Sequence, residues 1–289
     1  MKKPNLEPLA PRTKEASGMP KTFFAKAVSV LSPQIVYYVL GVFVTQCGAI
    51  ALTNQDTGDN SAWNTFVTRN STTLAFVIRL LAVVVAVLPL LEPLKDEALV
   101  YFAPKEKKPG VLSYVYTVLA AVGMAVFFNV LFKYVGITQA SESYDRVSQS
   151  QYSLPLWAGL FLYGLVTPLA EEIVHRGLIY NRLRRYFNLP AAMLFSPLIF
   201  AISHRNLPQF LYAFLMGLVI CVIYEKYGAF IFPVLFHMAA NIFVYTVSRY
   251  EAVNAFLASQ AVMSIMGIMS LVMLFLILCD GNPKAESEA

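Results

Sequence analysis

Long apolar runs separated by short polar segments make up most of this chain. Eight such runs can be recognised, and most are close to the roughly 20 residues that cross a bilayer as a helix. They cover residues 27–52, 73–91, 111–135, a run beginning near 154, 189–204, 208–224, 229–247 and 255–279. The pattern predicts an all-α, polytopic membrane helix bundle with about eight transmembrane helices.

The polar segments at the two ends fall outside this bundle. Residues 1–26 are rich in Pro, Lys and Glu and predict a disordered cytoplasmic tail. Residues 27–279 form the predicted bundle, with its most informative part at about 154–247, and residues 280–289 form a short polar tail. No internal repeat and no second, soluble domain is evident.

Composition supports a membrane protein. The chain is 57% hydrophobic and 13% charged, with a mean hydropathy of +0.59, whereas soluble domains carry about 25% charged residues. The net charge is +5, but the basic residues follow the loops and do not alternate with aromatics as on a nucleic-acid surface, so no nucleic-acid partner is expected. Cys47, Cys221 and Cys279 lie in or beside apolar runs and are expected to be small buried hydrophobes.

Basic residues are distributed unevenly between the two sides of the predicted bundle. One side holds six in the first tail, four in 92–110, three in 181–188 and one each at Lys226 and Lys284, or 15 in all, against five on the other. Eight spans would put both termini on the richer side. Because Lys and Arg accumulate in cytoplasmic loops, we expect a multi-pass protein of the cell membrane with both termini cytoplasmic.

A cluster of charges lies within the fourth apolar run. Glu171 and Glu172 are adjacent, and Arg176 follows Glu172 at the i,i+4 spacing that favours an ion pair on a helix. A charge at the bilayer centre costs about 2.5–3.5 kcal/mol on insertion scales. Either the helix ends here and the charges lie among headgroups, or they form a polar site inside the bundle. Arg79, in the second run, either reaches the interface or pairs with an acid.

All three histidines of the chain lie in or beside apolar runs. His175 follows the carboxylates, His204 ends the fifth run, and His237 lies inside the seventh with Asn241 on the same helical face. A single histidine in an apolar helix is commonly structural, but intramembrane ionisable groups usually face the interior and mark function. A full-length fifth span would carry His204 away from Glu171, unless that span is partial or tilted.

Three motifs in this order resemble those of a known family. The segments EEIVHR, FAISH and HMAAN match the EExxxR, FxxxH and HxxxN motifs of the CPBP family of intramembrane glutamic endopeptidases. That family includes the type II CAAX prenyl endopeptidases and proteins linked to bacteriocin self-immunity. The resemblance covers roughly a third of the chain and makes 154–247 the expected catalytic core.

The resemblance implies a role for each matching residue. Glu171 would activate a water molecule together with His204, and His237 and Asn241 would stabilise the oxyanion of the tetrahedral intermediate. Glu172 and Arg176 would support the site. The chemistry is reasonable in itself, because a carboxylate withdrawn from bulk water binds a proton more tightly and can act as general base or acid. An imidazole and an amide can donate to a developing oxyanion.

Other functions remain open from the sequence. Glu171, His204 and His237 could instead hold zinc with an open position, although no HExxH motif is present; the favoured mechanism needs no metal or other cofactor. The chain could also be a non-catalytic membrane scaffold or a bacteriocin immunity protein. A proton-coupled transporter would show inverted repeats, and none is evident.

The expected partners are the lipid bilayer and a membrane-anchored or lipidated peptide or protein substrate. Nothing in the sequence identifies a prenyl-binding groove, so the substrate itself is left open.

Overall fold

The described residues of the computed structural model, 22–53, 61–101 and 109–280, are predominantly helical, with no strand among them. The predicted tails therefore lie almost wholly outside the described residues. The elements are α1 (Phe23–Thr53), α2 (Ser61–Arg69), α3 (Ser71–Val87), η1 (Leu88–Leu90), α4 (Leu91–Tyr101), α5 (Val111–Tyr134), α6 (Glu142–Tyr152), α7 (Leu156–Gly159), η2 (Leu160–Val166), α8 (Thr167–Glu172), η3 (Ile173–Tyr180), α9 (Asn181–Tyr186), α10 (Leu189–Ile202), α11 (Leu207–Tyr227), α12 (Ile231–Val247), α13 (Glu251–Leu257) and α14 (Gln260–Cys279).

The all-α membrane bundle is confirmed, but the count of eight spans is not. Among the described residues six helices are long and apolar enough to cross a membrane, and α12 with α13 makes a seventh if that pair, bent by 120°, is one span. Helix α10 has only 14 residues. At 1.5 Å per residue it extends about 21 Å, which is less than the roughly 30 Å of the hydrocarbon layer.

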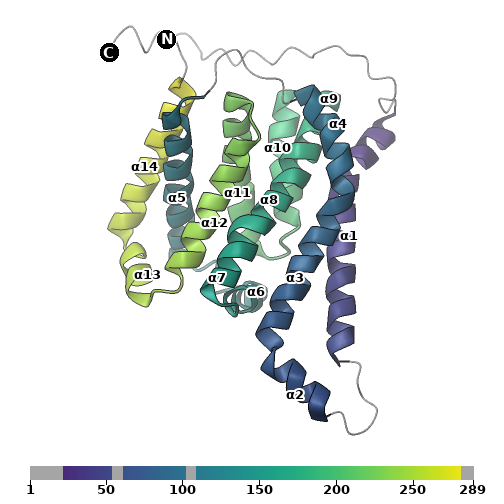
Figure 1. The fold of residues 1–289 in the computed structure, drawn as a ribbon. Helices are drawn as coiled ribbons and strands as arrows, with labels where there is room; N and C mark the ends of the chain where they lie inside the picture. Colours follow the sequence, from purple (N-terminus) through teal and green to yellow (C-terminus); the bar gives the residue numbers. More distant parts are fainter. Residues whose placement is uncertain (1–21, 54–60, 102–108, 281–289) are drawn as a thin grey trace.

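The helices are arranged as a bundle in which α7, α8 and α12 lie between two outer groups (Figure 1). Helices α5 and α14 form one side, and α1 and α3 form the other. Helix α1 begins and α14 ends at the same end of the bundle, whereas α6 lies toward the opposite end. We refer to these as the terminal end and the α6 end.

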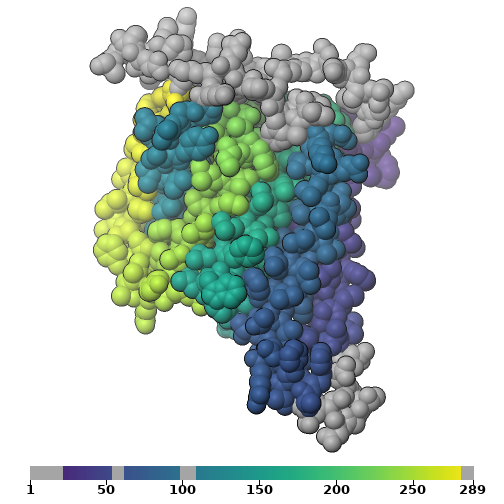
Figure 2. Space-filling model, in the orientation of Figure 1, coloured from purple at the N-terminus to yellow at the C-terminus, as the bar shows by residue number. Residues whose placement is uncertain are grey.

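One continuous helix, Leu156–Tyr186, runs through the segment that carries the predicted motif. It is made of α7, η2, α8, η3 and α9, and η2 and η3 have π-helical geometry. Its large exposed side chains recur every fourth residue, at Trp157, Phe161, Leu165 and Leu169. This spacing forms one stripe on a helix, and the teal α7–α8 surface shows between α3 and α12 in Figure 2. The stripe is suited to lipid, so the opposite face turns inward.

Glycines allow α12 to approach α7 and η2 closely. A Cβ added at Gly159 would lie 1.9 Å from the Tyr245 ring, and one at Gly164 would lie 2.8 Å from Cγ1 of Ile242. Small residues at such crossings let helix backbones pack together in membranes. This contact brings the polar residues of α12 against the carboxylate-bearing helix.

The structure bears on two sequence expectations about single residues. Among the described residues Arg79 forms no ion pair with an acid; it donates to Ser150, at 3.1 Å to the carbonyl and 2.7 Å to the hydroxyl, which ties α3 to the last turn of α6. That Arg79 reaches the interface stays a prediction, whereas the expectation that all three cysteines are buried is wrong. The three cysteines are free, but only Cys221 is buried. Cys47 is exposed, because it lies on α1 at the edge of the bundle.

Candidate active site

The carboxylate pair lies at the centre of a helix, not at its end. Glu171 is the middle residue of the 31-residue helix Leu156–Tyr186. The interpretation that the helix ends here among headgroups is therefore wrong, and the charges belong to a polar site inside the bundle. Glu171 keeps 21% of its side chain exposed, whereas Glu172 is fully buried. The two adjacent acids thus occupy different environments.

The carboxylate of Glu172 forms an ion pair inside the bundle. Arg176 Nη1 donates to Glu172 Oε1 at 2.9 Å, both side chains are fully buried, and the predicted i,i+4 pair is confirmed. Arg176 Nη2 also donates to the carbonyl of Gly217 at 3.3 Å. A Cβ at Gly217 would lie 3.2 Å from that nitrogen, so the glycine lets the guanidinium reach the backbone. The negative charge of Glu172 and the positive charge of Arg176 thus neutralise each other, as charges withdrawn from water require.

His237 lies between the two acids. Its Nδ1 is 2.8 Å from Glu172 Oε1, and its Nε2 is 3.6 Å from Glu171 Oε2. Glu172 is paired with Arg176, so we assign the Nδ1 proton as the donor to Glu172. The Nε2 atom then faces Glu171. Its position is set by α12, which Gly159 of α7 and Gly164 of η2 bring close.

His204 reaches the same site because α10 is short. The chain turns at Ser203 and His204, and Arg205 adopts a left-handed φ of 59° before α11 begins. The possibility of a partial fifth span is thus confirmed. His204 Nδ1 is 3.1 Å from the carbonyl of Phe200, which leaves Nε2 as the free ring nitrogen.

Phe200 organises the aromatic part of the site. Its ring centroid is 4.9 Å from that of His204, 5.7 Å from that of His237 and 4.7 Å from that of His175. The Arg176 guanidinium carbon lies 5.3 Å from the same ring, within cation–π range. Phe200 is the first residue of FAISH, and spacing alone did not indicate that it contacts all three imidazoles.

Asn241 has a backbone partner that the sequence did not predict. Its Nδ2 donates to the carbonyl of Tyr163 at 3.1 Å. In η2 the amide of Thr167 bonds to Leu162, five residues back. The next donor in that register is Pro168, which has no N–H, so the Tyr163 carbonyl is left for a side chain. One amide hydrogen of Asn241 is used here, and the second is left for the cavity.

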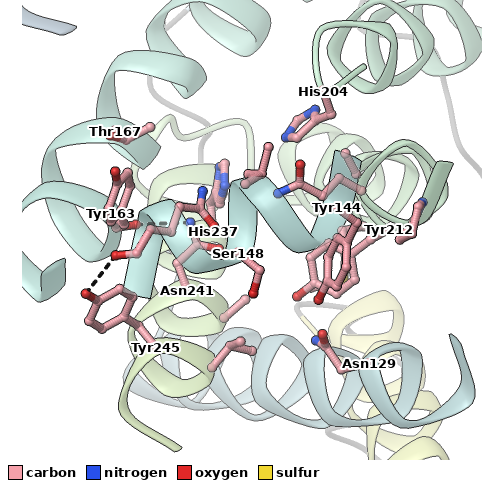
Figure 3. A pocket seen from close by; sticks show the side chains of 18 of the residues that line it. Asn129, Tyr144, Ser148, Tyr163, Thr167, His204, Tyr212, His237, Asn241 and Tyr245 are labelled. Carbon is pink, nitrogen blue, oxygen red and sulfur yellow. Dashed lines mark hydrogen bonds between the residues drawn. The ribbon is translucent and has the colours of Figure 1, made fainter. Parts of the chain in front are cut away.

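These residues surround a cavity of about 300 Å³, shown in Figure 3. Glu171, His204, His237 and Asn241 all line it, whereas Glu172 and Arg176 lie behind its wall. Figure 3 shows His237 and Asn241 on one side and Tyr144 and Tyr212 on the other. Burial raises the pKa of the Tyr144 phenol, whose helix α6 lies outside the spans, so the phenol keeps its proton. The four residues predicted to be catalytic are thus brought together.

A second cavity, of about 420 Å³, meets the first at Glu171. It lies among α1, α3 and η2, and Tyr163, Thr167, Glu171 and His204 line both cavities. The hydroxyl of Thr167 is buried there without a hydrogen-bond partner. Sequence reasoning missed Thr167, Tyr163 and the cavity-lining side of α6, since none has a recognisable motif.

The zinc alternative requires three side chains that converge on one point. Within the described part of the chain, no three His, Cys, Asp or Glu side chains converge closely enough to hold a metal ion. The contacts of His237 go to the two carboxylates. Glu171, His204 and His237, the residues of the zinc alternative, all line the cavity, but in this geometry their side chains are not arranged around one point where a metal ion could bind.

The fold and cavity define a multi-pass membrane protein with an ionisable site in its interior. Residues 153–243 match the family model described as type II CAAX prenyl endopeptidase Rce1-like. The chain is 29% identical over 126 residues to a protein of Bacillus subtilis named "Putative membrane peptidase YdiL", covering 44% of this chain and 50% of that protein. It is also 29% identical over 91 residues to "UPF0177 protein YxdF" of Lactococcus lactis, covering 31% and 50%.

The chain thus spans half the length of these curated relatives. No solved structure matches it. The matched segment contains EEIVHR and FAISH and extends through His237 and Asn241 of HMAAN, so the resemblance inferred from the three motifs is confirmed.

Proposed function

We propose that this protein is an intramembrane endopeptidase that hydrolyses a peptide bond of a membrane-associated substrate. The observation that carries the proposal is the unequal state of the two adjacent acids. Glu172 is buried and bonded to Arg176 and His237, whereas the carboxylate of Glu171 faces the cavity. Glu171 is therefore the acid free to exchange a proton with water.

In the proposed reaction a cavity water attacks the carbonyl carbon of the substrate. Glu171, assisted by His204, accepts a proton from the water as its oxygen forms the new C–O bond. The proton then passes to the amide nitrogen, the C–N bond breaks, and the products are a carboxylic acid and an amine. Neither acid serves as a nucleophile, so no covalent intermediate forms.

His237 and Asn241 supply donors to the oxyanion in this proposal. Asn241 has one amide hydrogen left after its bond to Tyr163. His237 can donate from Nε2 only when both ring nitrogens carry protons, since Nδ1–H is directed at Glu172.

The substrate is proposed to be membrane-anchored or lipidated, because the second cavity reaches Glu171 from between the outer helices α1 and α3. Its wall includes the small or apolar residues Gly41, Val42, Ala82, Val83 and Ala86. The distribution of Lys and Arg supports cytoplasmic termini and a location in the cell membrane. The similarity to the Rce1-like family and to the B. subtilis protein supports a peptidase in general.

Substitution of Glu171 tests the proposal. Glu171→Gln keeps the size of the side chain but removes the base, so peptide cleavage in liposomes should be lost while thermal unfolding is unchanged. The matched control is Glu142→Gln, since Glu142 is 93% exposed on α6. Substrates would be found by comparing the peptides of cells that express the wild type and Glu171→Gln. Normal cleavage by Glu171→Gln would contradict the assignment and favour a scaffold or an immunity protein.

A further inference from the structure

The turn that carries His204 to the active site contains a strained residue. Arg205 follows His204 directly and has a φ of 59°, and among the described residues it is the one non-glycine residue with a positive φ. A side chain with a Cβ crowds the backbone in this left-handed region, so the conformation costs free energy. Such strain persists only where surrounding contacts hold the backbone, and it is frequent at functional sites. The contacts of Arg205 and its neighbours therefore show what holds the turn.

The side chain of Arg205 reaches across to α1. Its guanidinium carbon lies 4.4 Å from the centroid of the Tyr38 ring, inside the roughly 6 Å limit of a cation–π contact. A planar guanidinium is well suited to stack on an aromatic face. Tyr38 belongs to α1, whereas Arg205 follows α10, so this contact joins the end of α10 to an outer helix of the bundle.

Asn206 holds the other side of the turn. Its Nδ2 donates to the carbonyl of His204 at 3.0 Å, and its Oδ1 accepts from the backbone N–H of Gln209 at 3.0 Å. The second bond caps the first turn of α11, and Asn206 itself is buried. The turn is therefore attached to α11 through Asn206 and to α1 through Arg205.

The imidazole of His204 depends on this turn for its position relative to Glu171. Its Nδ1 is 3.1 Å from the carbonyl of Phe200, and its ring centroid is 4.9 Å from that of the Phe200 ring. Phe200 lies in α10, so both contacts orient the imidazole relative to its own helix. Glu171 lies on a different helix, and the main chain at the end of α10 sets the distance between the two side chains. A shift of the turn would therefore move His204 away from its proposed partner.

We infer that Arg205 is a positioning residue for the proposed reaction, and that its stacking on Tyr38 holds the turn after α10 so that His204 stays beside Glu171. The inference rests on the proposed function for the role of His204. Among the described residues that line the two cavities meeting at Glu171, Arg205 is not included, so it acts through His204 and does not touch the substrate. Tyr38 lines the second cavity together with His204. Helix α1, which carries none of the three motifs, thus helps to place a residue of the site.

Substitutions that separate the backbone strain from the stacking contact test the inference. Glycine adopts a positive φ without a steric penalty, so Arg205→Gly relieves the strain as it removes the guanidinium, and thermal unfolding should change little. We expect kcat to fall about 10- to 100-fold with KM unchanged, because a displacement of about 1 Å at a catalytic group can cost 100-fold in rate. Tyr38→Phe keeps the aromatic face and should keep kcat, whereas Tyr38→Leu should lower kcat by a similar factor.

A double variant and a control complete the kinetic test. In the Tyr38→Leu protein the guanidinium has already lost its partner, so adding Arg205→Gly should lower kcat little further. Phe43→Leu is the matched control, since Phe43 lies on α1 and is 63% exposed. It should leave kcat, KM and thermal unfolding at their wild-type values.

A measurement without substrate follows His204 directly. The chain has three histidines, so nitrogen-15-labelled histidine in a protein with a histidine-free affinity tag gives three sets of imidazole signals in NMR spectra. His204→Gln identifies the signals of His204. Arg205→Gly and Tyr38→Leu should shift or broaden these signals and leave those of His175 and His237 unchanged. Tyr38→Phe and Phe43→Leu should leave all three sets unchanged.

Three results would overturn the inference. The first is an Arg205→Gly protein with wild-type kcat and unchanged His204 signals. The second is a double variant in which the losses from Arg205→Gly and Tyr38→Leu multiply, since the two residues would then act independently. The third is a change in all three imidazoles together with lower thermal stability, which would mark a structural role only. Normal cleavage by Glu171→Gln would instead remove the peptidase proposal, and the NMR signals would still decide whether Arg205 positions His204, so the two failures are distinguishable.

Discussion

His237 and Glu172 form the contact that joins α12 to the carboxylate-bearing helix, with Nδ1 of the imidazole 2.8 Å from Oε1 of the acid. The other ring nitrogen faces Glu171 at 3.6 Å. The imidazole of His237 therefore contacts both acids, each through a different nitrogen. Nδ1 makes a structural contact with Glu172, whereas Nε2 is the nitrogen that takes part in the proposed reaction.

The two nitrogens of His237 can be separated by substitution. In His237→Asn the amide can replace Nδ1 as donor to Glu172, but nothing replaces Nε2, so we expect near-normal thermal unfolding and loss of cleavage. His237→Leu removes both and should lower the free energy of unfolding by about 1–3 kcal/mol, because the partner is left buried and less satisfied. Thermal unfolding in detergent and peptide cleavage give the two readouts. Equal stability of these variants would contradict the structural role of Nδ1.

Arg176 compensates the buried charge of Glu172. Arg176→Met should destabilise the protein by roughly 3–5 kcal/mol, since it leaves an unpaired carboxylate in the bundle. Glu172→Gln added to Arg176→Met should recover part of that loss, because no unpaired charge remains. Arg146→Met is the control, since Arg146 is 71% exposed and its pair with Glu142 should contribute little. A stable Arg176→Met protein with unchanged unfolding would show that the pair is not needed for folding.

Asn241 is expected to satisfy the backbone carbonyl that Pro168 leaves without a donor. Asn241→Ala should lower the free energy of unfolding by about 1–3 kcal/mol, the penalty for an unsatisfied buried polar group. Pro168→Ala restores an N–H in the helix, so Asn241→Ala should lower the free energy of unfolding by less in the Pro168→Ala variant than in the wild type. A double-mutant cycle measured by thermal unfolding gives the coupling between the two positions. Strict additivity would show that the proline does not create the need for Asn241.

The close approach at Gly159 should be sensitive to a single methyl group. Gly159→Ala places a Cβ 1.9 Å from the Tyr245 ring, and overpacking of this kind costs about 1–3 kcal/mol. It should also reduce cleavage, because it moves α12 and with it His237 and Asn241. Gly110→Ala is the matched control, as its Cβ meets nothing within 4 Å. Tyr245→Ala, which removes the ring, should relieve the clash, and its failure to do so would contradict this account.

Metal removal tests the alternative in which Glu171, His204 and His237 bind zinc. We expect cleavage to survive exhaustive chelation, with no stoichiometric metal in the purified protein. An activity that disappears with the chelator and returns with zinc would replace the proposed mechanism by a zinc-dependent one. The readouts are initial rates and elemental analysis of the same preparation.

The sequence by itself determined the class of the protein and its chemical inventory. Apolar runs of bilayer length require helices, because a backbone in lipid must satisfy its own hydrogen bonds. The i,i+4 spacing of Glu172 and Arg176 predicted their ion pair, since local geometry in a helix fixes which residues share a face. The rare polar residues in apolar surroundings identified the candidates Glu171, His204, His237 and Asn241.

Only the tertiary structure decided how those residues are arranged. It showed that the carboxylate helix continues beyond Glu172, that α10 stops short so that His204 lies at the cavity, and that Asn241 is tied to Tyr163. Apolar periodicity could not reveal these features, because a short helix and a full span have the same composition. They depend on contacts between residues distant in the chain, and the apolar periodicity within one segment does not encode such contacts.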